Sequence, residues 1–103
     1  MILKHIAWAL AILAPLAPAV AADSVNGARL AERLCSSCHV PGTATKTGTD
    51  AGPPFAQIAA DPDLTEQRLR GWLANPHPPM PNPNLTRAEI EDLIAHIRGL
   101  KPR

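Results

Sequence analysis

The hydrophobic positions in the last third of the chain recur at helical spacing. Apolar residues fall at i, i+3, i+4 and i+7, on one face of a helix: Ile90, Leu93, Ile94 and Ile97. The preceding Thr86-Arg87-Ala88-Glu89 has the spacing of a capping box. Gly99 is placed to follow the helix, and Pro102 bars its continuation. The pattern predicts a C-terminal helix that begins after Thr86 and ends before Gly99.

Similar spacing occurs twice more along the chain. The pattern predicts a helix over residues 24–34, capped by Asp23 or Ser24, and another over residues 65–74. One apolar stripe marks the second of these: Leu69, Trp72 and Leu73. A short helix is expected over residues 54–60.

The segments between these helices contain glycine and proline. Residues 40–52 are mostly small and polar, and we expect a loop there. Residues 76–83 contain five prolines in eight positions, which excludes a helix or an inner strand. No segment shows the two-residue period of a strand. The sequence therefore predicts a small all-α domain of three to four helices.

Residues 1–22 have the composition of a secretory signal peptide. A lysine precedes an apolar run over residues 6–16, and small residues follow it. These small residues allow cleavage before Ala22 or before Asp23, which leaves residues 23–103 as one domain. An uncleaved membrane anchor is the alternative, but the apolar run is short for a spanning helix and contains proline.

The residues after this leader carry no net formal charge. The full chain has ten Lys and Arg against nine Asp and Glu, and one of the ten, Lys4, lies in the leader. This balance argues against a nucleic-acid or anionic-membrane partner, which would favour a basic patch. The domain is also short and poor in aromatic residues, so a bound apolar group would help to fill its core.

The most distinctive motif is Cys35-Ser36-Ser37-Cys38-His39, which has the C-x-x-C-H pattern of c-type haem attachment. In such a site two thiols form thioether bonds with the porphyrin vinyl groups, and the adjacent imidazole reaches the iron through Nε2. The motif therefore predicts one covalently bound haem c. Cys35 and Cys38 would attach it, and His39 would be an axial iron ligand.

Other interpretations of this motif have less support from the chain. A thiol redox site normally begins a helix within a β-α-β unit, and no strand pattern is present. A structural zinc site needs four ligands, whereas the chain has only two cysteines and its other histidines stand apart. A disulfide between Cys35 and Cys38 would leave His39 without a role.

Met80 is the expected second axial ligand. It is the only methionine after the leader, and prolines flank it on a loop. Its thioether is a soft ligand, and Met/His ligation raises the reduction potential of a haem. His77, in the same loop, is the alternative ligand. An open sixth position on the iron would require that Met80 be displaced.

Taken together, these motifs resemble the class I cytochromes c, and the small bacterial members most closely. The resemblance covers essentially the whole domain and rests on four ordered pieces: Gly27, the Cys35–His39 motif, Gly52-Pro53-Pro54-Phe55, and residues 75–81 before the last helix. It implies the small cytochrome c fold, in which a few helices wrap around one haem and the first and last helices cross.

The resemblance also implies roles for single residues. Gly27 would let the crossing helices approach closely. The backbone carbonyl of Pro53 would accept a hydrogen bond from Nδ1 of His39 and so orient the imidazole. Phe55 would pack on the haem. Trp72 would either lie in the core or donate a hydrogen bond to a haem propionate.

Two positions depart from the family pattern. The family usually has an aromatic residue four positions after the helix-crossing glycine, where this chain has Ala31. It usually has a second near the end of the last helix, where this chain has His96, which we expect to be a partly buried packing residue. The helix contact should therefore be thinner, with lower stability or compensation by a partner subunit.

The resemblance implies a periplasmic one-electron carrier rather than an enzyme. It would pass electrons between a periplasmic dehydrogenase or respiratory complex and an oxidase, so its partners would be redox proteins. No stable membrane insertion is expected after cleavage of the leader. One alternative is a dedicated cytochrome subunit of a periplasmic dehydrogenase. Another is a haem sensor or peroxidase with an open sixth iron position.

Overall fold

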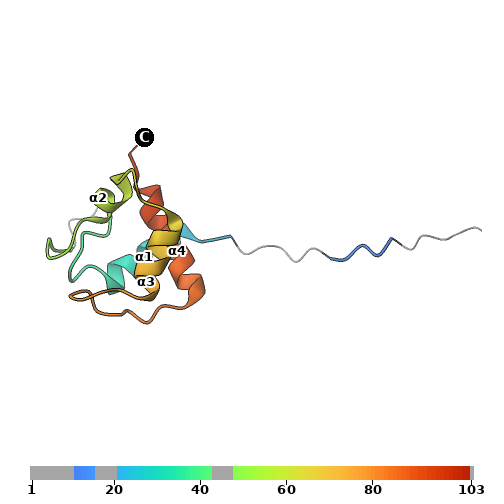
Figure 1. The fold of residues 1–103 in the computed structure, drawn as a ribbon, viewed down its shortest axis with the longest axis horizontal. Coiled ribbons are helices and arrows are strands. Elements are labelled where there is room, and N and C mark those ends of the chain that lie inside the picture. Colours follow the sequence, from blue (N-terminus) through green and yellow to red (C-terminus); the bar gives the residue numbers. More distant parts are fainter. Residues whose placement is uncertain (1–10, 16–20, 43–47, 103) are drawn as a thin grey trace, which may run out of the picture.

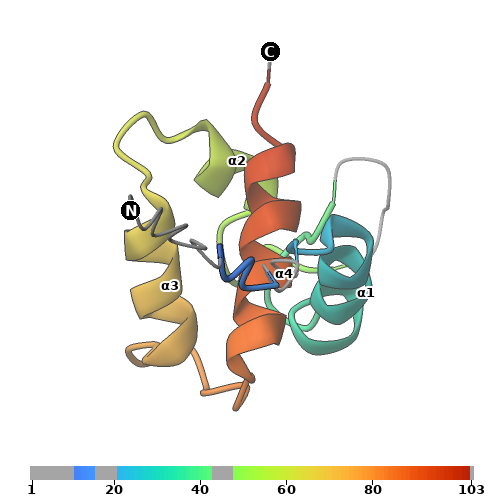
Figure 2. The same ribbon diagram turned by 90° about the vertical axis from the view of Figure 1, so that its right-hand side faces the viewer.

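The computed structural model of the chain describes residues 11–15, 21–42 and 48–102. Regular secondary structure in these ranges is helical and comprises four helices: α1 (Ser24–Leu34), α2 (Phe55–Ala60), α3 (Glu66–Ala74) and α4 (Arg87–Gly99) (Figure 1). Helix α4 lies between α1 and α3, and α2 packs beside its C-terminal half (Figure 2). The all-α prediction is therefore confirmed for the described part of the chain.

The three longer helices begin at residues whose side chains cap them. Asp23 accepts hydrogen bonds from two backbone N–H groups of the first turn of α1, each at 3.0 Å. Thr65 caps α3 in the same way at 3.0 Å. At α4, Thr86 and Glu89 form both bonds of the predicted capping box. These bonds satisfy N–H groups that lack partners within the helix, which explains the starting points.

The C-terminal end of α4 differs from the prediction. The sequence predicts that Gly99 follows the helix, but Gly99 is its last residue and Leu100 is the C-cap, with φ −83°. Leu100 is partly buried against the core. Because burial of this side chain is favourable, the helical backbone continues one residue further than expected.

The hydrophobic core is centred on α4 and receives side chains from every helix. Its buried members are Leu30, Ala31, Cys35, Phe55, Ala59, Leu69, Leu73, Ile90, Leu93, Ile94 and Ile97. The predicted apolar face of α4 is therefore confirmed. The predicted stripe on α3 is only partly correct, because Trp72 is 41% exposed and does not belong to the core.

Helices α1 and α4 cross at Gly27. A side chain at this position would overlap the backbone carbonyl of Asp92 and lie 2.9 Å from Cβ of His96. Ala31, one turn further along α1, is completely buried. The small size of both residues lets the two helices approach closely. The predicted close approach at Gly27 is therefore confirmed.

Asp92 adds a polar connection beside this crossing. One carboxylate oxygen accepts a hydrogen bond from the backbone N–H of Asp23 at 2.7 Å. The other accepts from the side-chain amide of Asn26 at 2.8 Å. Both bonds hold the pKa of Asp92 below its usual value, and the bond from the backbone N–H has the larger effect. The carboxylate thus connects α4 to the N-terminus of α1.

Ion pairs join α3 to α4. The guanidinium of Arg70 binds the carboxylate of Glu91 through two hydrogen bonds, at 2.6 and 2.9 Å. This bidentate contact lowers the pKa of Glu91. A longer pair at 3.5 Å joins Arg98 to Glu66. Since all four side chains are substantially exposed, water and salt screen these contacts.

Most of the predicted leader falls outside the described residues. Residues 1–10 and 16–20 belong to this group, so leader cleavage stays a prediction. Among the residues that the structure describes, no helix combines the length and apolar character needed to cross a membrane.

Replacement of Gly27 by Ala should destabilise the protein by about 3 kcal/mol, because the new methyl group would force α4 away from α1. Gly71→Ala, on α3, is the matched control, since a Cβ at this position meets no atom within 4 Å. That variant should gain about 0.5–1 kcal/mol from helix propensity. Denaturant unfolding measures both changes, and equal stability of the two variants would contradict the close crossing.

Replacement of Asp92 by Asn should reduce the pH dependence of stability. The folded-state pKa of Asp92 is lowered, so its contribution is fully present above the unfolded value of about 4 and is lost as pH falls through the folded pKa. Unfolding at pH 6 and at pH 2 should therefore differ less in Asp92→Asn than in the wild type. Asp63→Asn, on the loop before α3, controls for the loss of one negative charge. If the stability of Asp92→Asn differed between pH 6 and pH 2 by as much as that of the wild type, the charged contact would be excluded.

Candidate functional site

The C-x-x-C-H motif forms a tight turn directly after α1. Cys35 is the C-cap of the helix. Its carbonyl accepts hydrogen bonds from the backbone N–H of Cys38 at 3.1 Å and of His39 at 2.9 Å. The turn therefore places two thiols and an imidazole close together in one short segment. Cys35 is buried, whereas Cys38 and His39 are half-buried.

The two cysteines are free thiols in the structure. Burial, and after it the charge of Cys38, raises the pKa of the Cys35 thiol. The zinc alternative gains no support, since no group of three or more His, Cys, Asp or Glu side chains converges in the described part of the chain.

The imidazole of His39 is oriented by a backbone carbonyl. Its Nδ1 lies 2.7 Å from the carbonyl oxygen of Pro53. A carbonyl oxygen can only accept, so Nδ1 carries the proton and donates it. In the neutral ring Nε2 then has a free lone pair, which is the form of histidine that binds a metal. The contact that the family resemblance implies is thus present.

Two backbone hydrogen bonds hold the His39 segment against the residues before α2. The N–H of Gly52 donates to the carbonyl of Cys38, and the N–H of Phe55 donates to the carbonyl of Val40 at 3.0 Å. Residues 38–40 and 52–55 are therefore connected at three points, if the Pro53 contact is included. The sequence reasoning assigned no role to these contacts.

Gly52 lies directly against the imidazole. A Cβ at this position would be 2.5 Å from Cε1 of His39 and 2.8 Å from Nδ1. Only glycine leaves room for the ring in its observed orientation. The sequence reasoning placed Gly52 in the family motif but missed this function. Its position next to Pro53 was the available signal.

Phe55 lies between two imidazole rings. Its ring centroid is 5.2 Å from that of His39 and 6.4 Å from that of His96, in tilted arrangements. Only 4% of the residue is exposed. Phe55 therefore connects the His39 segment to the core and to α4.

Met80 and Trp72 come from another part of the molecule, α3 and the proline-rich loop after it. Met80 is half-buried, and its backbone N–H donates to the carbonyl of His77 at 3.1 Å. His77 is exposed. The exposed Trp72 lies beneath the guanidinium of Arg68, with 5.9 Å between Cζ and the ring centroid. In the described part of the chain, no hydrogen bond or ring contact joins Met80 or Trp72 to the motif.

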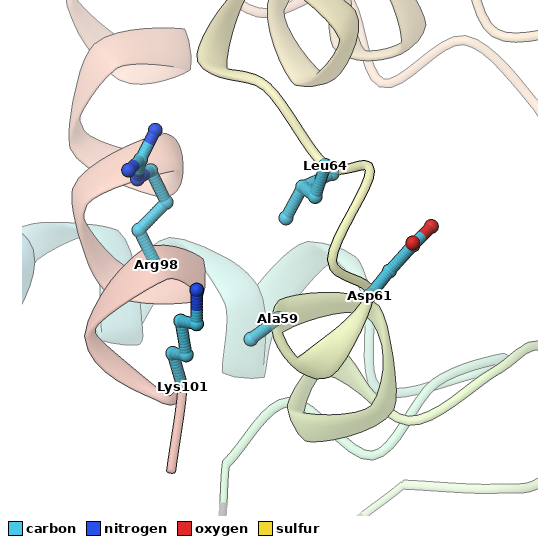
Figure 3. Close-up of a pocket in the computed structure, with 5 residues that line it drawn as sticks. All are labelled: Ala59, Asp61, Leu64, Arg98 and Lys101. Atoms are coloured by element: carbon cyan, nitrogen blue, oxygen red, sulfur yellow. The ribbon is translucent and has the colours of Figure 1, made fainter. Parts of the chain in front are cut away.

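A separate hollow lies between α4 and the residues at the end of α2 (Figure 3). It is lined by Ala59, Asp61, Leu64, Arg98 and Lys101. Its volume of about 50 Å³ suits one or two water molecules and is far too small for a porphyrin. The hollow contains none of the predicted site residues, so it is not the cofactor site.

The donor set of the motif fits a c-type haem. Two free thiols flank a tight turn, the adjacent imidazole has its Nδ1 proton engaged, and a glycine leaves space for that ring. Leu34, immediately before the motif, is 40% exposed.

Comparison with known proteins agrees with this arrangement. The family model described as "Cytochrome c" matches residues 24–101. The chain belongs to the cytochrome c family. It is 39% identical over 100 residues to a protein named cytochrome c-552 from Bradyrhizobium diazoefficiens, and the match covers 97% of this chain and 96% of that protein.

A solved structure shows the same fold. The c-type cytochrome SorU from Sinorhizobium meliloti superposes with a TM-score of 0.59, at 23% identity, over 75% of this chain and 88% of that one. The fold is thus the cytochrome c fold that the resemblance implied. Membership of the family shows that the cofactor is covalently bound haem c and that the protein is an electron carrier with redox partners.

Replacement of Gly52 by Ala should displace the imidazole of His39, because the methyl group would occupy the space of the ring. We expect a loss of about 1–3 kcal/mol in the holoprotein and a change in its reduction potential through the weakened Nδ1 bond. Gly99→Ala is the matched control, because a Cβ there meets no atom within 4 Å. Unfolding and redox titration test both variants. A wild-type potential in Gly52→Ala would show that the ring does not depend on this glycine.

Proposed function

We propose that this cytochrome c carries single electrons between redox proteins in the bacterial periplasm, with its haem bound through Cys35, Cys38 and His39. The observation that carries the proposal is the hydrogen bond between Nδ1 of His39 and the Pro53 carbonyl. It fixes the tautomer that leaves Nε2 free for iron, directly beside two free thiols.

Each residue of the site has a defined part in this proposal. Cys35 and Cys38 would form the thioether bonds, and His39 and Met80 would ligate the iron. When bound, the haem supplies the redox chemistry, accepting one electron from a donor protein and releasing it to an acceptor. The chain itself supplies ligation, burial and a docking surface, and no proton transfer is required.

The residues around Met80 agree with a ligand role for its sulfur. Met80 is half-buried on a loop whose prolines restrict its backbone, whereas His77 is exposed. Nδ1 of His77 lies 3.2 Å from the carbonyl of Pro78. The proposal therefore assigns the second ligand to Met80 and leaves His77 on the surface. Trp72, which is exposed beside Arg68, keeps the proposed role of a haem propionate donor.

Export to the periplasm follows from the predicted leader and from the chemistry of haem attachment. Residues 1–22 have the order of regions expected of a signal peptide. The proposed partners are a periplasmic dehydrogenase or respiratory complex as donor and an oxidase as acceptor.

A dedicated subunit of a periplasmic dehydrogenase is the second candidate, and the helix crossing bears on it. The family aromatics are absent at Ala31 and His96, but Asp92 connects α4 to α1, and His96 is itself engaged with the chain. This compensation within the chain favours a free carrier. If the isolated holoprotein is as stable as any complex it forms, the subunit hypothesis loses its basis.

Replacement of Met80 by Ala tests the ligand assignment. The oxidised variant should lose the weak far-red sulfur-to-iron absorption band, its reduction potential should fall, and the reduced form should bind CO without denaturant. His77→Ala is the matched control from the same loop and should keep the band and the potential. Retention of the band in Met80→Ala would refute His/Met ligation, and so would its absence from the wild type.

A further inference from the structure

His96 is placed at the helix crossing and also contacts the chain after the haem motif. It lies on α4, where its Cβ would be 2.9 Å from a Cβ at Gly27. Its Nε2 is 2.5 Å from the carbonyl oxygen of Pro41. The side chain is half-buried, whereas Pro41 is completely buried. Because a carbonyl oxygen can only accept, Nε2 carries the proton in this contact.

Pro41 belongs to the same short segment as His39. The other contacts of this segment run to residues 52–55: Gly52 to the Cys38 carbonyl, His39 to the Pro53 carbonyl, and Phe55 to the Val40 carbonyl. The bond from His96 is of another kind, because it attaches the segment to α4. It lies two residues beyond the imidazole that the proposed function assigns to the iron.

A second path connects the two histidines. Phe55 lies between them, with ring centroid distances of 5.2 Å to His39 and 6.4 Å to His96. His96 is therefore connected to the His39 region by a hydrogen bond to Pro41 and by ring packing through Phe55. A purely aromatic residue at position 96 would retain the packing but would offer no ring N–H to Pro41.

We propose that His96 is a positioning residue for the haem ligand His39. Its Nε2–H donates a hydrogen bond to the carbonyl of Pro41. This bond keeps the segment that carries His39 in a fixed position relative to Pro53. The Nδ1 bond of His39 then stays short, which raises the basicity of the ligand and favours the oxidised iron. This inference rests on the proposed role of His39 and adds a residue of α4 to the set that determines the reduction potential.

Two variants of the holoprotein separate the hydrogen bond from the packing. His96→Phe keeps a ring against Phe55 and Gly27 but has no donor. His96→Gln keeps an N–H donor at a position similar to Nε2 but has no ring. In His96→Phe we expect a higher reduction potential. We also expect the His39 Nδ1 proton to exchange about fivefold faster, because the loss of one neutral hydrogen bond changes an equilibrium by about this factor. His96→Gln should be closer to the wild type in both.

Redox titration and proton NMR of the holoprotein measure these two quantities, and denaturant unfolding records stability separately. A wild-type potential and exchange rate in His96→Phe would overturn the proposal. Equal changes in both variants would also overturn it, because they would assign the effect to packing alone.

The proposed function can fail without affecting this test. If the wild type lacks the far-red band, His/Met ligation is wrong. The exchange rate of the His39 Nδ1 proton in the two variants then still reports whether His96 positions the ring.

Discussion

The close crossing of α1 and α4 is the constraint on which the other contacts of this domain depend. Gly27 has no side chain and the buried Ala31 has only a methyl group, so the backbone of α1 at Gly27 lies against the Asp92 carbonyl. The haem motif begins directly after α1, at the C-cap residue Cys35. The position of α1 relative to α4 therefore decides where the two cysteines and His39 are held.

Polar contacts at both ends of this crossing replace the aromatic packing that the family usually has there. At one end, Asp92 binds the start of α1 through Asp23 and Asn26. At the other, His96 reaches the Pro41 carbonyl beyond the haem motif. Hydrogen bonds with buried or charged partners have direction, so they fix orientation as well as distance. A compact chain with few aromatic residues can in this way define its helix crossing.

Backbone groups make up much of the surroundings of His39, the proposed iron ligand. Its imidazole is oriented by the Pro53 carbonyl, and Gly52 leaves the space that the ring occupies. Main-chain groups of the adjoining residues connect the two segments. Main-chain groups thus provide the contacts that orient the imidazole.

The elements that local rules govern were predictable from the sequence. The capping box at Thr86 and the apolar period of residues 90–97 located the last helix, and five consecutive residues of the haem motif indicated the cofactor. These signals act between residues a few positions apart, where helical geometry and thioether chemistry demand particular spacings.

Tertiary structure decided the contacts between distant segments. The bond from His96 to Pro41, the place of Gly52 under His39 and the exposure of Trp72 all depend on how separate helices and loops pack. A periodic pattern assigns Trp72 to an apolar stripe but cannot say which edge of that stripe the neighbouring helix covers. The sequence determined the helices and the chemistry of the haem motif, whereas packing determined which groups hold His39, because those groups meet only when the chain is folded.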